Sequence, residues 1–237
     1  MPGELRISAK SLGELAWPGF CPRCFWIRLH AQGLPYQIFP GIFSSIDSYT
    51  KKVVHGYCDQ HRCFPPWLED LGELTGYQAP LHYTKFKIFD EASGVTLWGT
   101  PDGVFTTKDK SYVIVDYKTA RYTSNQDALM PVYEVQLNAY AAIGEGSGLV
   151  KPVSGLALVY MEPVTGEDAA VDGSNHRDDG FTMGFSAHIH KVKLEPDLIP
   201  SLLVKARTIY ELGRPPDGRA GCHDCENVAG LLDMLSK

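Results

Sequence analysis

The sequence has no long hydrophobic run, no excess of basic residues and no internal repeat. A membrane-spanning helix needs about 20 consecutive apolar residues, and the longest apolar runs here are interrupted by Lys, Asp or Gly. The beginning of the chain, MPGELRISAKSLGELAW, has no apolar core after a basic head, so we expect no secretion signal. These absences predict a cytoplasmic, intracellular protein without a membrane partner, and they leave a viral origin open.

Basic residues are outnumbered by acidic ones, 22 to 28, which gives a net charge of −6. This argues against a protein that coats nucleic acid by bulk charge, because such binding needs many phosphate-neutralising side chains. It does not exclude an enzyme with a local basic groove. The 237 residues are enough to bury a core, and hydrophobic and charged fractions of 44% and 21% exclude general disorder.

The hydrophobic pattern predicts helices at both ends of the chain and a sheet in the middle. We expect helices within 7–29, from a capping-box-like start at Ser44 and Asp47 to about His55, over 131–143 with Gly144, Gly146 and Gly148 ending it, and over 197–212. We expect three successive antiparallel strands over 82–90, 95–107 and 111–118, further strands over 155–162 and 181–194, a turn-rich segment at 33–41 and a solvated acidic loop at 162–180.

This order of elements predicts an α/β or α+β domain with one central mixed β-sheet flanked by helices. We expect a single domain over 1–237. It comprises an N-terminal helical part at 1–77, a catalytic core at 78–212 and a cysteine-bearing tail at 213–237.

Two acidic residues and a lysine stand at the ends of two predicted strands. Asp102 ends the second strand in GTPD, and Asp116 and Lys118 end the third in VIVDYK. Residues i and i+2 of a strand point to the same face, so Asp116 and Lys118 share a face with Ile114, while Tyr117 shares the other with Val115. The fourteen positions from Asp102 to Asp116 fit two hairpin-paired strands, which would place the two carboxylates side by side.

Such an arrangement is electrostatically costly, because like charges repel and charges near an apolar interior lose solvation. A divalent cation offsets both effects, since Mg²⁺ or Mn²⁺ prefers carboxylate oxygens. It also polarises a phosphoryl oxygen and activates water, and a nearby lysine can stabilise the charge that develops. Asp-x-Lys alone also occurs by chance at the ends of ordinary strands.

A further pair of polar residues follows on the next predicted helix, Gln136 and Tyr140 in QLNAY. Positions i and i+4 lie on one helical face, although a packing helix could carry the same pair. Together, GTPD, DYK and QLNAY resemble the PD-(D/E)XK nuclease superfamily and, within it, the RecB-like branch, which includes the CRISPR adaptation exonucleases and AddB-type nuclease domains. The resemblance extends from about Leu81 to Leu212, and the early CPRCFW is also similar to members of the branch.

The resemblance implies a restriction-endonuclease-like core and a role for each matching residue. Asp102 and Asp116 would bind Mg²⁺ or Mn²⁺, with the Tyr117 carbonyl as a third ligand. Lys118 would assist the attacking water, and Gln136 and Tyr140 would orient Lys118 or the DNA backbone. The branch carries an upstream histidine ligand, for which His55 is the positional candidate; a solvent-facing histidine near a helix end is the alternative.

Cysteine pairs occur near both ends of the chain, Cys21-x-x-Cys24 and Cys222-x-x-Cys225. Two such pairs can complete a four-cysteine metal site, and six cysteines in a long, non-secreted chain favour metal over disulfides. The related exonucleases carry a 4Fe–4S cluster, with one early and three late cysteines, whereas this chain has two and two. Structural Zn²⁺ and unmetallated core thiols are the alternatives.

Two other groups of potential ligands have plainer explanations. The first group, which consists of His55, Cys58, His61 and Cys63, is explained as ordinary core cysteines beside a loop. The second group, His188 and His190, is explained as an exposed strand surface.

The sequence therefore predicts a metal-dependent DNA nuclease, an exonuclease or an end- or structure-specific enzyme acting on single-stranded or end-bearing DNA. Its protein partners would belong to DNA repair, phage or CRISPR processing. The alternatives are a non-catalytic nucleic-acid-binding or assembly subunit on the same fold, and a metal-bearing scaffold for protein docking.

Overall fold

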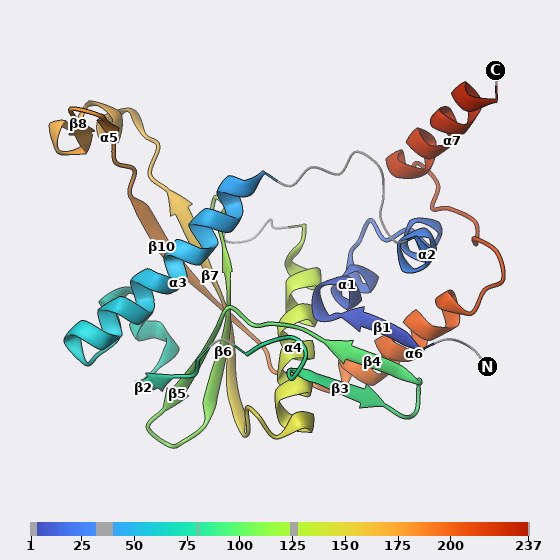
Figure 1. Ribbon diagram of the computed structural model, residues 1–237, viewed down its shortest axis with the longest axis horizontal. Coiled ribbons are helices and arrows are strands. Elements are labelled where there is room, and N and C mark those ends of the chain that lie inside the picture. Colours follow the sequence, from blue (N-terminus) through green and yellow to red (C-terminus); the bar gives the residue numbers. More distant parts are fainter. Residues whose placement is uncertain (1–3, 32–39, 80, 124–127, 237) are drawn as a thin grey trace.

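The structure is a computed structural model that describes residues 4–31, 40–79, 81–123 and 128–236 (Figure 1). The helices are α1 (Ala9–Gly13), α2 (Pro22–His30), α3 (Gly41–His61), α4 (Met130–Ser147), α5 (Glu167–Val171), α6 (Leu198–Tyr210) and α7 (His223–Leu235), with short 3₁₀ helices η1 (Glu14–Ala16), η2 (Pro66–Leu71) and η3 (Gly173–Asn175). The strands are β1 (Leu5–Ser8), β2 (Leu74–Tyr77), β3 (Lys87–Asp90), β4 (Val95–Trp98), β5 (Gly103–Thr107), β6 (Tyr112–Lys118), β7 (Val153–Pro163), β8 (His176–Arg177), β9 (Gly180–Phe181) and β10 (Phe185–Val192).

The main sheet has five strands in the order β10-β7-β6-β5-β2. Strands β6 and β7 run parallel, and the other neighbours run antiparallel, so the sheet is mixed. A parallel pair needs a crossover connection, which α4 supplies between β6 and β7. The α/β architecture with a central mixed sheet flanked by helices is thereby confirmed.

The predicted three-stranded meander is wrong in its middle strand. Residues 95–107 form two strands: β4 pairs with β1 and β3 in a separate small sheet, whereas β5 pairs with β6 in the main sheet. The strand is interrupted between Trp98 and Gly103, where Pro101 has no N–H to donate to a neighbouring strand. Gly99 there packs against an aromatic ring, because a Cβ at this position would lie 2.4 Å from Cε1 of Tyr140.

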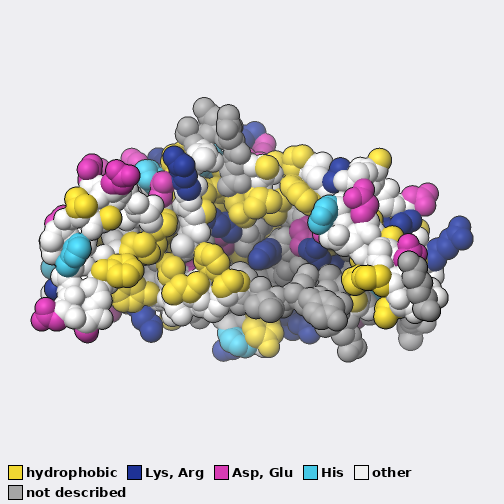
Figure 2. All heavy atoms as spheres, turned by 90° about the horizontal axis from the view of Figure 1, so that it is seen from above, with side chains coloured by type: hydrophobic (Ala, Val, Ile, Leu, Met, Phe, Trp, Pro, Cys, Tyr) yellow, Lys and Arg dark blue, Asp and Glu magenta, His cyan; other side chains and the backbone are white. Residues whose placement is uncertain are grey.

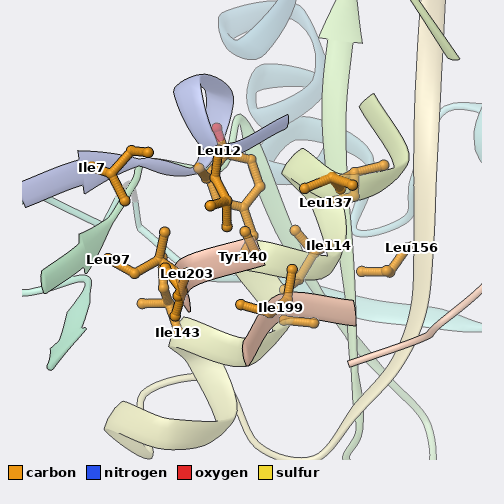
Figure 3. Packing of buried hydrophobic residues seen from close by; sticks show 14 of the residues in the cluster. Ile7, Leu12, Leu97, Ile114, Leu137, Tyr140, Ile143, Leu156, Ile199 and Leu203 are labelled. Carbon is orange, nitrogen blue, oxygen red and sulfur yellow. The ribbon is translucent and has the colours of Figure 1, made fainter. Parts of the chain in front are cut away.

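Helix α4 lies at the centre of the fold and contacts strands of both sheets. Its apolar residues pack with α1, α6 and one face of the main sheet, as Figure 3 shows for ten labelled side chains: Ile7, Leu12, Leu97, Ile114, Leu137, Tyr140, Ile143, Leu156, Ile199 and Leu203. The opposite sheet face packs against α3 and η2 through a second cluster. Ile114 belongs to the first cluster, and Val115 and Tyr117 to the second, so the predicted alternation along β6 is confirmed.

Several helix boundaries differ from those predicted. Helix α3 begins at Gly41 rather than near Ser44 and continues past His55 to His61, where Arg62 adopts a left-handed conformation with φ of 60°. Helix α4 contains Gly144 and ends only at Gly148, whose φ of 73° suits a glycine cap. Gly144 lies within the helix, and its lack of a side chain leaves space for Val150, which would lie 2.8 Å from a Cβ at this position.

Two regions expected to lack regular structure contain some. Within the predicted loop at 162–180, the first two residues belong to the end of β7, and the rest includes α5, η3 and β8. In Figure 1 this region projects beyond the main sheet. Strand β9 begins at its end, and the strand expected over 181–194 is divided into β9 and β10. The tail forms α7, and most of the turn-rich segment 33–41 lies outside the described residues. Among the described helices, none combines the length and the apolar character that crossing a membrane requires.

Candidate active site and cysteine centre

The register of β5 and β6 brings Asp102 and Asp116 together. Gly103 pairs with Val115, so Asp102, immediately before Gly103, lies beside Asp116, immediately after Val115. Asp102 does not end a strand as predicted; it lies in the break between β4 and β5, where its Oδ2 accepts a 2.9 Å hydrogen bond from the Tyr117 backbone N–H. The hairpin spacing correctly predicts the neighbouring positions of the two acids.

Asp116, Lys118, Gln136 and Tyr140 form one buried polar network between β6 and α4. The Lys118 ammonium lies 2.5 Å from Asp116 Oδ2. The Gln136 amide donates to Asp116 Oδ1 at 3.1 Å and to the Tyr140 hydroxyl at 2.9 Å, and its carbonyl accepts from Lys118 at 3.4 Å. The structure thus brings together four of the residues expected from the sequence, and Gln136 contacts each of the other three.

A second lysine, Lys51, also reaches the acidic pair and was missed by sequence reasoning. Its ammonium, on α3, lies 2.7 Å from Asp102 Oδ1 and 2.9 Å from Asp47 Oδ2. Burial alone would lower the pKa of Lys51, but the Asp102 carboxylate, followed by Asp47, raises it above the ordinary value. The one sequence signal for Lys51 is its position one helical turn before His55, the residue that was predicted as a metal ligand.

His55 itself lies apart from the acidic pair. Its ring stacks on Tyr77, with centroids 4.0 Å apart and planes at 4°, and partial burial lowers its pKa. Among the described residues, it does not form a group of three potential metal ligands with Asp102 and Asp116. The assignment of His55 as a ligand stays a prediction.

Electrostatics at the acidic pair suit a divalent cation. Burial, and next the charge of Asp116, raises the pKa of Asp102 to about 6. The buried Asp116 Oδ2 accepts no hydrogen bond in the described part of the chain, although it is ion-paired with Lys118. Asp102 is costly to ionise, and the neighbouring Asp116 Oδ2 accepts no hydrogen bond among the described residues. Mg²⁺ and Mn²⁺ prefer oxygen ligands and would stabilise both carboxylates.

The four predicted cysteines converge from opposite ends of the chain. Helices α2 and α7 contact each other at one end of the molecule (Figure 1), and the sulfurs of Cys21, Cys24, Cys222 and Cys225 all lie within 4.8 Å of one another. Individual distances are 3.6 Å for Cys21–Cys225, 3.6 Å for Cys24–Cys222 and 3.5 Å for Cys24–Cys225. Four thiolates bound to one tetrahedral ion at about 2.3 Å would lie about 3.8 Å apart. The set therefore fits a single metal ion.

The thiols differ in their readiness to ionise. Burial opposes ionisation of Cys21, but hydrogen bonds to its sulfur, first from the backbone at Cys24 and Arg219, lower its pKa to about 6. Burial raises the pKa of Cys24, and its hydrogen bonds to the other three thiols raise it further. Metal binding releases such protons, because the thiolate is the ligand.

The other cysteines and histidines form no comparable group among the described residues. Cys58 packs against the second core cluster and Cys63 is exposed. His188 stacks on Tyr122, with centroids 4.8 Å apart, and its Nε2 lies 3.5 Å from Glu162 Oε2. Cys58 thus agrees with the expected core role, whereas Cys63 does not, and His188 and His190 are partly buried rather than fully exposed.

Paired carboxylates and a lysine at the main sheet, with Gln136 facing them from α4, are the residue types expected of a nuclease site. The family model described as the PD-(D/E)XK nuclease superfamily matches residues 43–227, well over half of the chain. The chain therefore belongs to the PD-(D/E)XK nuclease superfamily.

Solved structures and curated proteins were compared as well. The crystal structure of SSO0001 is similar at 12% identity and a TM-score of 0.40, covering 91% of this chain and 80% of that one. An alkaline exonuclease from Laribacter hongkongensis is similar at 9% identity and a TM-score of 0.39, covering 96% and 94%. A search of curated proteins gives no match.

Proposed function

We propose that the protein is a divalent-metal-dependent deoxyribonuclease that hydrolyses phosphodiester bonds in single-stranded or end-bearing DNA, as an exonuclease or an end- or structure-specific enzyme. The observation that carries the proposal is the meeting of Asp102 and Asp116 from a hairpin with Lys118, whose ammonium lies 2.5 Å from Asp116. The superfamily supports a nuclease; the metal and the DNA substrate are part of the proposal.

Asp102 and Asp116, with the Tyr117 carbonyl, would hold Mg²⁺ or Mn²⁺. When bound, such an ion polarises the phosphoryl oxygen and makes its water more acidic. Lys118, 18% exposed at its side chain, can reach a phosphate that approaches the acids and stabilise the negative charge that develops on it. Gln136 holds Asp116 and Lys118 in position through its two hydrogen bonds, and Tyr140 fixes the Gln136 amide in turn.

The cysteine centre has a structural role in this proposal. It joins α2 to the start of α7, two segments about two hundred positions apart in the sequence. The family resemblance suggests a 4Fe–4S cluster. Because such a cluster places iron and sulfide ions between the thiolates, its cysteine sulfurs lie farther apart than those that bind a single ion. Sulfur distances of 3.5–3.6 Å favour the zinc alternative.

Cleavage of end-labelled single-stranded DNA with added Mg²⁺ or Mn²⁺ tests the proposal. We expect Lys118→Ala to lose activity by about two orders of magnitude or more, because it removes a charge that stabilises the transition state. The matched control is Lys108→Ala, since Lys108 is exposed and paired only with Glu73 among the described carboxylates. Equal activity in Lys118→Ala and Lys108→Ala would reject the proposed mechanism.

The second candidate is a non-catalytic nucleic-acid-binding or assembly subunit on the same fold. The acidic pair disfavours it, because carboxylates facing phosphates weaken binding unless a cation lies between them. A protein that binds DNA but cleaves none with either ion would establish this alternative. Partners in DNA repair, phage or CRISPR processing are compatible with both candidates.

A further inference from the structure

A groove of about 570 Å³ connects the proposed catalytic lysine to the cysteine centre. Lys118 lines one part of it, and Cys21, Cys24 and Cys222 line another. The two sites are therefore parts of one continuous surface.

The groove is more basic than the chain as a whole. Four cationic side chains line it against two acidic ones, Glu14 and Asp224, in a protein with a net charge of −6. The cations are Lys10, Arg28, Lys118 and Arg219. Arg28 is ion-paired with Glu14 and Lys118 with Asp116. In the described part of the chain, the Arg219 guanidinium contacts backbone carbonyls of Gly19 and Ala220 rather than a carboxylate. Its charge is thus available to an anion in the groove.

The groove also presents aromatic rings, of which Trp17 is the most suited to a ligand. Trp17 is 41% exposed, yet it is held firmly. Phe20 N–H donates to the Trp17 carbonyl at 2.9 Å, and a Cβ on Gly19 would lie 2.8 Å from Trp17 Cζ2, so the indole packs directly on the glycine. At the other end, the Lys118 ammonium lies 4.1 Å from the centre of the Tyr133 ring.

The cysteine centre fixes one wall of the groove. The Arg219 backbone N–H donates to Cys21 Sγ at 3.2 Å, and the Arg219 side chain donates to the Gly19 carbonyl at 3.2 Å. Arg219 therefore links the thiol set to the segment that carries Trp17. Figure 2 shows basic and acidic side chains together near the middle of the face that it views, with hydrophobic ones on either side.

We propose that this groove binds one strand of a polynucleotide beyond the cleavage site, with a base stacked on Trp17 and a phosphate near Arg219. A basic groove with exposed rings is the arrangement by which proteins hold single strands without reading their sequence. The inference rests on the proposed nuclease function, because Lys118 is the point at which the groove meets the site. It adds the residues that give the enzyme its preference for a strand over a small phosphodiester.

Two substrates separate this proposal from the proposed function. Single-stranded oligothymidine offers bases and several phosphates to the groove, whereas bis(p-nitrophenyl) phosphate offers one phosphodiester and no nucleobase. We expect Trp17→Ala to raise the KM for oligothymidine about tenfold, as loss of one stacked base does, with kcat unchanged because stacking is equal in ground and transition states. Turnover of the small diester should not change, and Trp17→Phe should restore most of the oligothymidine affinity.

The control is Phe181→Ala, which removes another exposed ring, on β9 in the projecting region. If Trp17→Ala leaves the KM for oligothymidine unchanged, the groove proposal is wrong and the nuclease function stands. If Trp17→Ala lowers turnover of both substrates equally, Trp17 is structural and the groove proposal is also wrong. If the wild-type protein hydrolyses neither substrate with Mg²⁺ or Mn²⁺, the proposed function itself fails.

Discussion

Replacement of Asp102 by Asn should stabilise the protein when no Mg²⁺ or Mn²⁺ is added. The physical reason is that folding places this carboxylate in a largely buried position beside Asp116, which raises the pKa of Asp102 to about 6. The substitution removes the charge and keeps an oxygen that can accept the hydrogen bond from the Tyr117 N–H. Most replacements of buried polar residues destabilise a protein, so the expected sign is distinctive.

The sign and size follow from the pKa of Asp102. Its ordinary value is 3.8 and its folded value about 6, so the folded state binds the proton more tightly. The contribution of Asp102 to stability is therefore full below pH 4 and is lost as the pH rises through 6. The whole difference corresponds to at most about 3 kcal/mol, of which about 1.4 kcal/mol falls between pH 5 and pH 8.

Urea denaturation of wild type and Asp102→Asn at pH 5 and pH 8 measures this effect. The advantage of the variant should grow by about 1.4 kcal/mol from pH 5 to pH 8, and added Mn²⁺ should stabilise the wild type more than the variant. Asp109→Asn is the control: hydrogen bonds from Thr107 and Ser111 lower the pKa of Asp109 below its ordinary value, so this variant should be less stable than wild type by the same margin at pH 5 and pH 8. An Asp102→Asn protein that is less stable than wild type by the same margin at both pH values would refute the reasoning.

Three further predictions concern the supporting residues. Gln136→Leu should lower activity about 10–100-fold and stability by about 1–3 kcal/mol, since Asp116 loses its buried donor; steady-state kinetics and thermal melts measure both. Gly99→Ala should cost about 1–3 kcal/mol, because its Cβ would meet Tyr140 at 2.4 Å; an unchanged melting temperature would contradict this contact. Cys24→Ser should reduce the metal bound by purified protein and lower its melting temperature, and elemental analysis that finds zinc rather than iron would support a single-ion site.

The sequence predicts the central elements well where a local pattern matches the tertiary environment. Strand β6 is apolar up to Asp116, and the buried position of this strand in the sheet agrees with that pattern. The division of 95–107 is different, because a strand pattern continues on both sides of the break. Pro101, which has no N–H for a strand ladder, is a local signal for the interruption. The tertiary contact of Gly99 with Tyr140, about forty positions away, is not contained in a local pattern.

The candidate site shows the same contrast. Asp102, Asp116 and Lys118 come from one hairpin, whose register follows from its length, and Gln136 and Tyr140 follow from helical periodicity. Lys51 approaches from α3, whose packing against the sheet sets its position. Its place one helical turn before His55 was the one local signal, and this does not predict the contact with Asp102. The convergence of the cysteines is predicted by the spacing of the two pairs together with the family resemblance. Helix α7, which begins directly after Cys222 and contains Cys225, was not predicted.

The most direct test of the central claim is the rate at which Asp116→Ala cleaves single-stranded DNA with Mn²⁺, compared with wild type at matched folding by circular dichroism. If the two hairpin carboxylates bind the ion that activates hydrolysis, the wild type degrades the DNA and the variant is slower by about a thousandfold or more. A folded Asp116→Ala protein with wild-type activity would show that phosphodiester hydrolysis, if the protein performs it, takes place elsewhere.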